Sequence, residues 1–225
     1  MNIIKIKKLS FGYTSKKENL KNINLEIEEG KFTCIVGENG SGKSTLLKCI
    51  LGLNKGYTGE IEKTCKIGYL PQVTEIQKNF PASIEEVVMS GTISNNPISI
   101  FYKKEDKEKA KNIMKQLDIY EIRKTSFADL SGGQKQRVLI ARAMCATEKV
   151  IILDEPTNGL DPNIANQIYT ILNDLKKKNG LTILMVSHDT YRALKYADKV
   201  IEMENGKIKF NGNVEEYKNG GDKKW

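Results

Sequence analysis

Gly37-Glu38-Asn39-Gly40-Ser41-Gly42-Lys43-Ser44-Thr45 is the stretch that decides the fold of this chain. It matches the pattern G-x-x-x-x-G-K-[ST], whose glycines let the backbone curl so that its N–H groups point at phosphate oxygens. The residues on either side fit this interpretation. Lys31–Val36 is a short apolar run that predicts a buried strand, and Ser44–Leu51 carries its apolar residues at helical spacing, with Gly52 as a stop. A flexible glycine turn is the alternative, and it would not need this strand and helix.

Two side chains of the loop predict nucleotide chemistry. Lys43 can reach the β- and γ-phosphates of a nucleotide, and the Ser44 hydroxyl can bind Mg²⁺. The helix that begins at Ser44 adds the positive end of its dipole. We therefore expect a nucleoside triphosphate with Mg²⁺, held by Gly37, Glu38, Asn39, Gly40, Ser41, Gly42, Lys43, Ser44 and Thr45.

A second element follows far along the chain. Val150–Leu153 is an apolar, β-branched strand that ends in two carboxylates, Asp154 and Glu155. A buried strand would deliver Asp154 to the Mg²⁺ side of the phosphates, and Glu155 could polarise the attacking water as a general base. Two solvated acids at a strand end are the alternative, which the upstream loop makes the weaker one.

Leu130-Ser131-Gly132-Gly133-Gln134 precedes an apolar, arginine-bearing helix predicted over Lys135–Met144. By itself it could be an N-cap serine with a glycine turn. It is also a second anion site, because Ser131 and backbone N–H groups meet at a helix N-terminus. One chain does not need two cradles for a γ-phosphate, so the second one makes sense if it serves the ATP of another subunit.

The remaining elements complete an α/β fold. A length of 225 residues fits one large α/β domain, or one core with a small lobe. Helical periodicity over Asp106–Leu117 predicts a helical lobe within about 81–147, and Pro162 opens a further helix. The other expected features are strands at Ile3–Lys7, Asn22–Ile27 and Thr182–Val186, two strands within Gly59–Leu70, a hairpin at Glu204–Lys207, and a polar, frayed tail over Lys218–Lys224.

Composition excludes several classes of protein. The four cysteines form no C-x-x-C pair and the chain has a single histidine, so the ligand spacing of a structural zinc site is missing. We expect the cysteines to be small buried hydrophobic residues of a protein in a reducing compartment. The net charge of +8 is scattered, so we expect no nucleic-acid partner. No apolar run approaches the roughly 20 residues needed to cross a bilayer, so we expect a cytoplasmic chain that reaches a membrane through a partner.

Taken together, the three motifs resemble ATP-binding-cassette ATPases, in the family's order and nearly from end to end. The resemblance implies a P-loop NTPase (RecA-like) core with an antiparallel β subdomain, over 1–75 and 148–225, and a helical subdomain over 76–147. It implies ATP hydrolysis by a head-to-tail homodimer. Each ATP would lie between Gly37–Thr45 of one chain and Ser131, Gly132, Gly133 and Gln134 of its partner.

Four further positions are similar to functional residues of the family. Tyr13 matches the aromatic residue that stacks on adenine, with Phe11 as the rival and a half-buried strand tyrosine as the structural alternative. Gln72 matches the glutamine that meets Mg²⁺ and water, with an exposed loop amide as the alternative. Asp161 matches the loop at the dimer seam and also suits an N-cap before a proline. The single histidine, His188, follows a predicted strand and matches the family's switch position beside the γ-phosphate; it counts with Lys43 and Glu155 as catalytic.

The sequence departs from the family's pattern at Glu38 and Glu148, where many relatives have proline, and neither side chain has a role in the expected hydrolysis step. A compact cassette without coiled-coil insertions resembles a transporter ATPase more than a repair or translation protein. Intact Glu155 and His188 argue against a regulatory module that binds ATP without turnover. The resemblance implies separate membrane permease subunits, attachment to the inner face of the membrane, and an extracytoplasmic solute-binding protein.

A weaker likeness addresses the transported substrate. Asn79–Val88 with Gly91, together with Phe127-Ala128-Asp129, is similar to zinc and manganese importer ATPases, with iron-chelate or other small-solute importers as the rival. An ordinary loop and helix start, capped by Pro81 and Ser83, is the structural alternative. The transported metal would not touch this subunit.

Overall fold

A mainly parallel sheet of six strands forms the centre of the computed structural model, which describes residues 1–14, 17–72, 81–95, 102–147 and 149–220. The strand order is β5-β6-β7-β3-β8-β9, and only β9 runs antiparallel to its neighbour within this described sheet. The strands are β3 (Phe32–Val36), β5 (Ile67–Leu70), β6 (Val150–Asp154), β7 (Thr182–Val186), β8 (Lys199–Glu204) and β9 (Lys207–Asn213). Every residue of β3, β6 and β7 is buried, which confirms the three buried strands predicted from their apolar runs.

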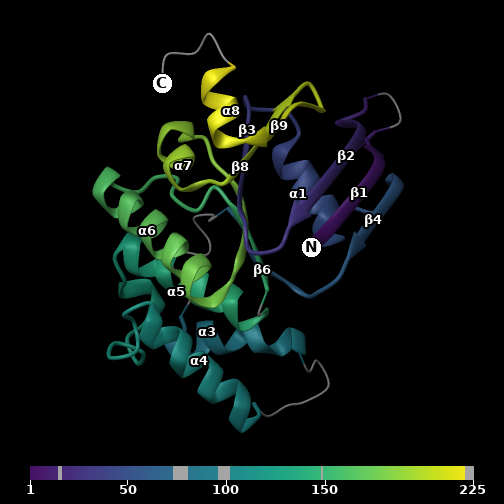
Figure 1. The fold of residues 1–225 in the computed structure, drawn as a ribbon. Coiled ribbons are helices and arrows are strands. Elements are labelled where there is room, and N and C mark those ends of the chain that lie inside the picture. Colours follow the sequence, from purple (N-terminus) through teal and green to yellow (C-terminus); the bar gives the residue numbers. More distant parts are fainter. Residues whose placement is uncertain (15–16, 73–80, 96–101, 148, 221–225) are drawn as a thin grey trace.

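Both faces of this sheet are covered (Figure 1). On one face α1 (Lys43–Leu51) and a three-stranded antiparallel sheet, ordered β2-β1-β4, pack around Leu46, Leu47 and Ile50. The three strands are β1 (Asn2–Phe11), β2 (Leu20–Glu28) and β4 (Thr58–Lys63). On the other face lie α5 (Gly132–Cys145), α6 (Pro162–Asn179) and α7 (Thr190–Tyr196). Because successive residues of a strand point to opposite faces, Cys34 faces these helices and Ile35 faces α1.

The predicted helical lobe is observed at one end of the molecule, where α3 (Ile84–Met89), α4 (Lys104–Gln116) and α5 lie together in Figure 1. Two short 3₁₀ helices accompany them, η1 (Ser90–Asn95) and η2 (Phe127–Asp129). Ser83 caps α3 with a reciprocal bond to Glu86, as the sequence suggested. The subdomain boundaries at 75/76 and 147/148 stay a prediction, and they fall at or beside residues outside the described ranges.

The ends of several elements differ from the sequence-based expectation. β1 continues to Phe11, four residues beyond the predicted end. The tail was expected to be frayed from Lys218, but Lys218 belongs to a helix, α8 (Val214–Asn219). A capping box between Asn213 and Glu216 starts this helix, and its Tyr217 ring packs 5.0 Å from that of Phe210. The hairpin at Glu204–Lys207 is confirmed, whereas residues 221–225 lie outside the described ranges.

Three cysteines, Cys34, Cys49 and Cys145, are buried, Cys65 is half-buried, and all four are free thiols. This confirms the interpretation as small buried apolar residues for the three buried cysteines, whereas Cys65 is only partly buried. Within the described ranges, none of the helices combines the length and the apolar character that crossing a bilayer requires.

Candidate active site

The glycine-rich loop between β3 and α1 has the curled backbone that its sequence predicts. Gly37, Gly40 and Gly42 have φ values of +141°, +80° and +106°, which side-chain-bearing residues rarely adopt. At Gly37 an added Cβ would also lie 2.2 Å from the backbone oxygen of Met203 on β8. Glycine is therefore required here by both the backbone angle and the closeness of the neighbouring strand. α1 begins at Lys43, with Gly42 as its N-cap, so the N–H groups of its first turn face the loop.

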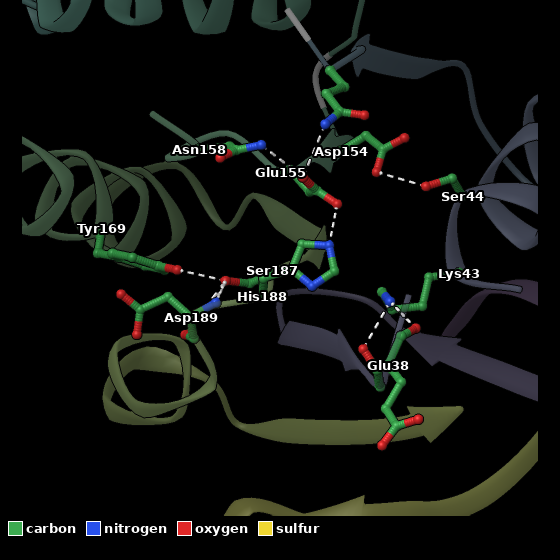
Figure 2. Close-up of polar contacts among 12 residues, drawn as sticks. Glu38, Lys43, Ser44, Asp154, Glu155, Asn158, Tyr169, Ser187, His188 and Asp189 are labelled. Atoms are coloured by element: carbon green, nitrogen blue, oxygen red, sulfur yellow. Dashed lines mark hydrogen bonds and ion pairs between the residues drawn. The ribbon is translucent and has the colours of Figure 1, made fainter. Parts of the chain in front are cut away.

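The Lys43 ammonium is held inside this loop (Figure 2). Its Nζ donates hydrogen bonds of 2.8 Å to the backbone oxygens of both Gly37 and Glu38. Burial lowers the pKa of Lys43, while the nearby carboxylates of Glu155 and Asp154 act in the opposite direction. The loop thus combines inward N–H groups with one localised cation, which is the chemistry that binds phosphate.

Ser44 and Asp154 meet although 110 residues separate them in sequence: the Ser44 hydroxyl donates to Asp154 Oδ1 over 3.2 Å. Asp154 ends β6 and is 3% exposed. Burial raises the pKa of Asp154, and the Ser44 hydrogen bond partly offsets this effect. Mg²⁺ prefers oxygen ligands, so this pair of hard oxygens fits the ion expected from the sequence.

Glu155 lies at the centre of the polar contacts in Figure 2. Its Oε2 accepts hydrogen bonds of 3.0 Å from Gln72 Nε2 and from Asn158 Nδ2, and its Oε1 lies 2.5 Å from His188 Nε2. The Glu155 side chain is only 10% exposed, and the residue has a φ of +52°, in the left-handed region. Non-glycine residues in this region cost free energy and cluster at functional sites. Three donors from separate segments therefore fix one carboxylate beside the Ser44–Asp154 pair.

Gln72 takes a different partner from the one expected. The resemblance implied that it meets Mg²⁺ with Ser44 and Asp154, but its amide binds Glu155 instead. Its role as a Mg²⁺ ligand stays a prediction. Asn158 was not predicted, because a single amide two residues after a proline carries no periodic or motif signal in the sequence.

The predicted partner-facing residues form helix caps in this chain. Ser131 is the N-cap of α5: its hydroxyl accepts from the N–H of Gln134, whose side chain accepts from the N–H of Ser131. Asp161 is the N-cap of α6 and accepts from the N–H of Asn163 over 2.8 Å. The capping interpretations are therefore confirmed. Ser131, Gly132, Gln134 and Asp161 are also exposed, so a second subunit could reach them.

The structure separates the two aromatic candidates for adenine stacking. Phe11 is buried in β1, whereas Tyr13 lies beyond the end of that strand and is 57% exposed. The expectation of a half-buried strand tyrosine is therefore wrong. The Tyr13 ring packs edge-to-face on Phe11, with 5.0 Å between centroids, and its hydroxyl accepts from Asn54. Tyr13 is thus held in place by two contacts while more than half of it is exposed.

A curled glycine loop with a buried lysine, a Ser–Asp oxygen pair and a fixed glutamate meet where several parallel strands end. Ligands of open α/β sheets bind outside these carboxyl ends. Fold and site together define a P-loop nucleotide-binding cassette.

Comparison with known proteins agrees. Residues 20–158 match the ABC transporter family. The zinc uptake system ATP-binding protein ZurA of Listeria innocua is 37% identical, covering 96% of this chain and 87% of the relative. The manganese transport system ATP-binding protein MntB of Bacillus subtilis is 38% identical, covering 87% and 81%. A dimeric ATP-binding cassette solved with ADP and phosphate superposes with a TM-score of 0.76 at 29% identity, covering 94% and 98%. The chain belongs to the ABC transporter family, as an ATP-binding and ATP-hydrolysing subunit.

Proposed function

We propose that this chain powers the import of a divalent metal ion, zinc or manganese, through separate membrane subunits. The observation that carries this proposal is the 37–38% identity, over most of both chains, with relatives named for zinc uptake and manganese transport. The segment that is similar to metal importers, Asn79–Val88 with Gly91, belongs to the described part of the structure only from Pro81 onward; Asn79 and Phe80 lie outside the described residues. Import of an iron chelate is the alternative.

The site supports the following division of roles. Lys43 and the loop N–H groups bind the phosphates, and Tyr13 stacks on the adenine. Ser44, Asp154 and Gln72 would hold Mg²⁺, which when bound neutralises charge on the phosphates. Glu155 orients and polarises the water that attacks the γ-phosphate, giving ADP and inorganic phosphate, and His188 bridges Glu155 to that phosphate.

A homodimer would complete the site. The Ser131–Gln134 segment, in which all residues but Gly133 are exposed, would bind the γ-phosphate held by the partner's loop, with Asp161 at the seam. A solved relative of the chain is itself a dimeric cassette. ATP would then hold two chains together through charge-assisted contacts, and hydrolysis would release them.

An apolar cavity of about 370 Å³ beside Gln72 supports docking of a membrane subunit. Its lining residues are Pro71, Ala82, Glu86, Val87, Ser90, Phe127, Leu139 and Arg142. Pro71 directly precedes Gln72, which binds Glu155, so a segment seated in this cavity would sense the state of the site. We place the chain on the cytoplasmic face of the membrane through this contact, with a solute-binding protein on the other side.

The test is whole-cell metal content in a strain that lacks this chain. We expect zinc or manganese to fall, and wild type to restore it whereas Glu155→Gln does not. Glu60→Gln is the matched control, because Glu60 is an exposed residue of β4 whose partner is Lys7. A fall in iron alone would favour the chelate alternative. Unchanged metals would refute metal import and leave the ATPase assignment intact.

The docking contact is tested with Ala82→Arg. This half-buried residue lines the docking cavity and not the neighbouring cavity that contains Glu155. We expect the purified variant, assayed without membrane subunits, to bind and hydrolyse ATP as wild type does. In the cell it should fail to restore metal content. Full restoration would exclude this cavity as the docking site.

A further inference from the structure

The buried phenol of Tyr169 contacts the residue that directly precedes His188, the predicted switch histidine. Tyr169 on α6 is wholly buried, and its hydroxyl lies 2.9 Å from Ser187 Oγ, which belongs to the residue just before His188 (Figure 2). Ser187 is itself 3% exposed, and its hydroxyl also accepts from the N–H of Asp189 over 3.1 Å. A polar contact is therefore built into the core next to the site, where a phenylalanine would otherwise suffice.

The position of the Tyr169 hydroxyl is fixed by packing. Its ring stacks on that of Tyr196, with centroids 5.5 Å apart and planes 6° from parallel. Burial raises the pKa of Tyr169 to about 12, while the hydroxyls of Ser187 and Thr157 act in the opposite direction. The phenol is therefore neutral at physiological pH and keeps its proton for a hydrogen bond. Thr157 belongs to the segment that joins Glu155 to Asn158, so Tyr169 lies where two segments of the site converge.

The His188 segment has little apolar packing on its open side. A cavity of about 230 Å³ lies against it, lined by residues that include Asn158, Ala165 and Arg192. The His188 side chain is 43% exposed. A segment that faces a cavity depends on its polar contacts for its position. The Ser187 N–H donates to the backbone oxygen of Ile35 over 3.3 Å, and the His188 backbone oxygen accepts from Thr190. Among the side-chain contacts of Ser187, the one to Tyr169 is the contact that ties this segment to α6.

We propose that Tyr169 is a positioning residue, whose hydroxyl holds Ser187 and so aims His188 at Glu155. This inference rests on the roles proposed above for Glu155 and His188. It also has a mechanical consequence. Because Tyr169 lies two turns along the helix that Asp161 caps, a shift of α6 at the dimer seam would reach His188 through this hydrogen bond.

The variant that tests it is Tyr169→Phe, which keeps the ring and its stacking and removes only the hydroxyl. We expect kcat for ATP to fall about 3- to 10-fold, as for the loss of one buried hydrogen bond, with KM unchanged. Tyr196→Phe is the matched control: it removes the hydroxyl from the other ring of the same stack, whose partner is the exposed Thr170, and kcat should stay within about twofold.

A spectroscopic measurement separates positioning from general loss of structure. His188 is the only histidine, so ¹⁵N-histidine labelling of the full chain gives imidazole NMR signals that need no assignment. Tyr169→Phe should shift or broaden these signals, and Tyr196→Phe should leave them as in wild type. Ser187→Ala serves as a second variant, should Tyr169→Phe not fold, and it should reproduce both effects.

Two failures are distinguishable. If Tyr169→Phe and Ser187→Ala keep the wild-type kcat and His188 signals while Glu155→Gln is inactive, the positioning role of Tyr169 is overturned and the proposed site survives. If Glu155→Gln hydrolyses ATP as wild type does, the proposed site itself is overturned, and the inference with it.

Discussion

Replacing Glu155 by glutamine tests the centre of the site with little change in shape. The carboxylate has two different sides: two amide donors meet Oε2, and His188 Nε2 meets Oε1. A glutamine can keep its carbonyl oxygen toward the two amides and turn its NH₂ toward His188, which accepts in its neutral form with the proton on Nδ1. We therefore expect the free energy of unfolding to change by less than about 1 kcal/mol.

The loss should appear in the chemical step. General-base catalysis contributes about 10²- to 10⁴-fold, or about 3–5 kcal/mol of transition-state stabilisation. The rate of phosphate release at saturating ATP should fall by that factor, while the affinity for a fluorescent ATP analogue changes less than about threefold. Glu60→Gln is the control and should leave both quantities as in wild type. A Glu155→Gln chain that kept more than about a tenth of wild-type turnover would refute the assignment of Glu155 as general base.

Three further predictions follow from the same contacts. Burial raises the pKa of Asp154 above its ordinary value of 3.8, so its ionised form destabilises the fold at neutral pH; this penalty shrinks as the pH falls through the raised pKa and is gone below 3.8. Asp154→Asn should therefore melt higher than wild type at pH 7, lose that advantage by pH 3.8, and lack ATP turnover; a lower melting temperature at pH 7 would contradict the sign. Gly37→Ala should lower the free energy of unfolding in urea by about 1–3 kcal/mol more than Gly40→Ala does, because both glycines have positive φ but only a Cβ at position 37 would meet another atom within 4 Å. Equal losses of free energy would show that the contact with β8 is relieved easily. Tyr13→Ala should weaken ATP binding by about 1–3 kcal/mol in calorimetry, whereas Phe11→Leu should lower stability and leave affinity unchanged; the reverse result would assign adenine stacking to Phe11.

Local patterns predicted the elements of this chain well where their signal lies in consecutive residues. Val150–Leu153 and Thr182–Val186 are apolar on both faces and became central parallel strands. Asp161 and Pro162 predicted the start of α6 because a cap depends on the residues beside it. Element ends were less certain: alternation could not tell that β1 continues to Phe11, since pairing with β2 and β4 decides where a strand stops.

The residues around Glu155 illustrate what local patterns could not supply. The sequence identified Gln72 as a site residue but predicted that it binds Mg²⁺ rather than Glu155. No pattern in the sequence pointed to Asn158 or Tyr169. Each of these side chains acquires its partner only when separate segments converge on the ends of β6 and β7.

By itself, the sequence determined that a glycine-rich loop joins a buried strand to a helix and that an acidic strand and a capped Ser131 segment follow. These features depend on backbone freedom, capping and periodicity, which act over a few residues. Only the tertiary structure decided which donors hold Glu155, that Tyr13 rather than Phe11 is exposed, and that Tyr169 reaches Ser187. The donors meet Glu155 because parallel strands far apart in sequence end at the same edge of one sheet, so that the side chains following them lie close together. The exposure of Tyr13 depends on where β1 stops pairing, and the contact of Tyr169 depends on how α6 packs on the sheet.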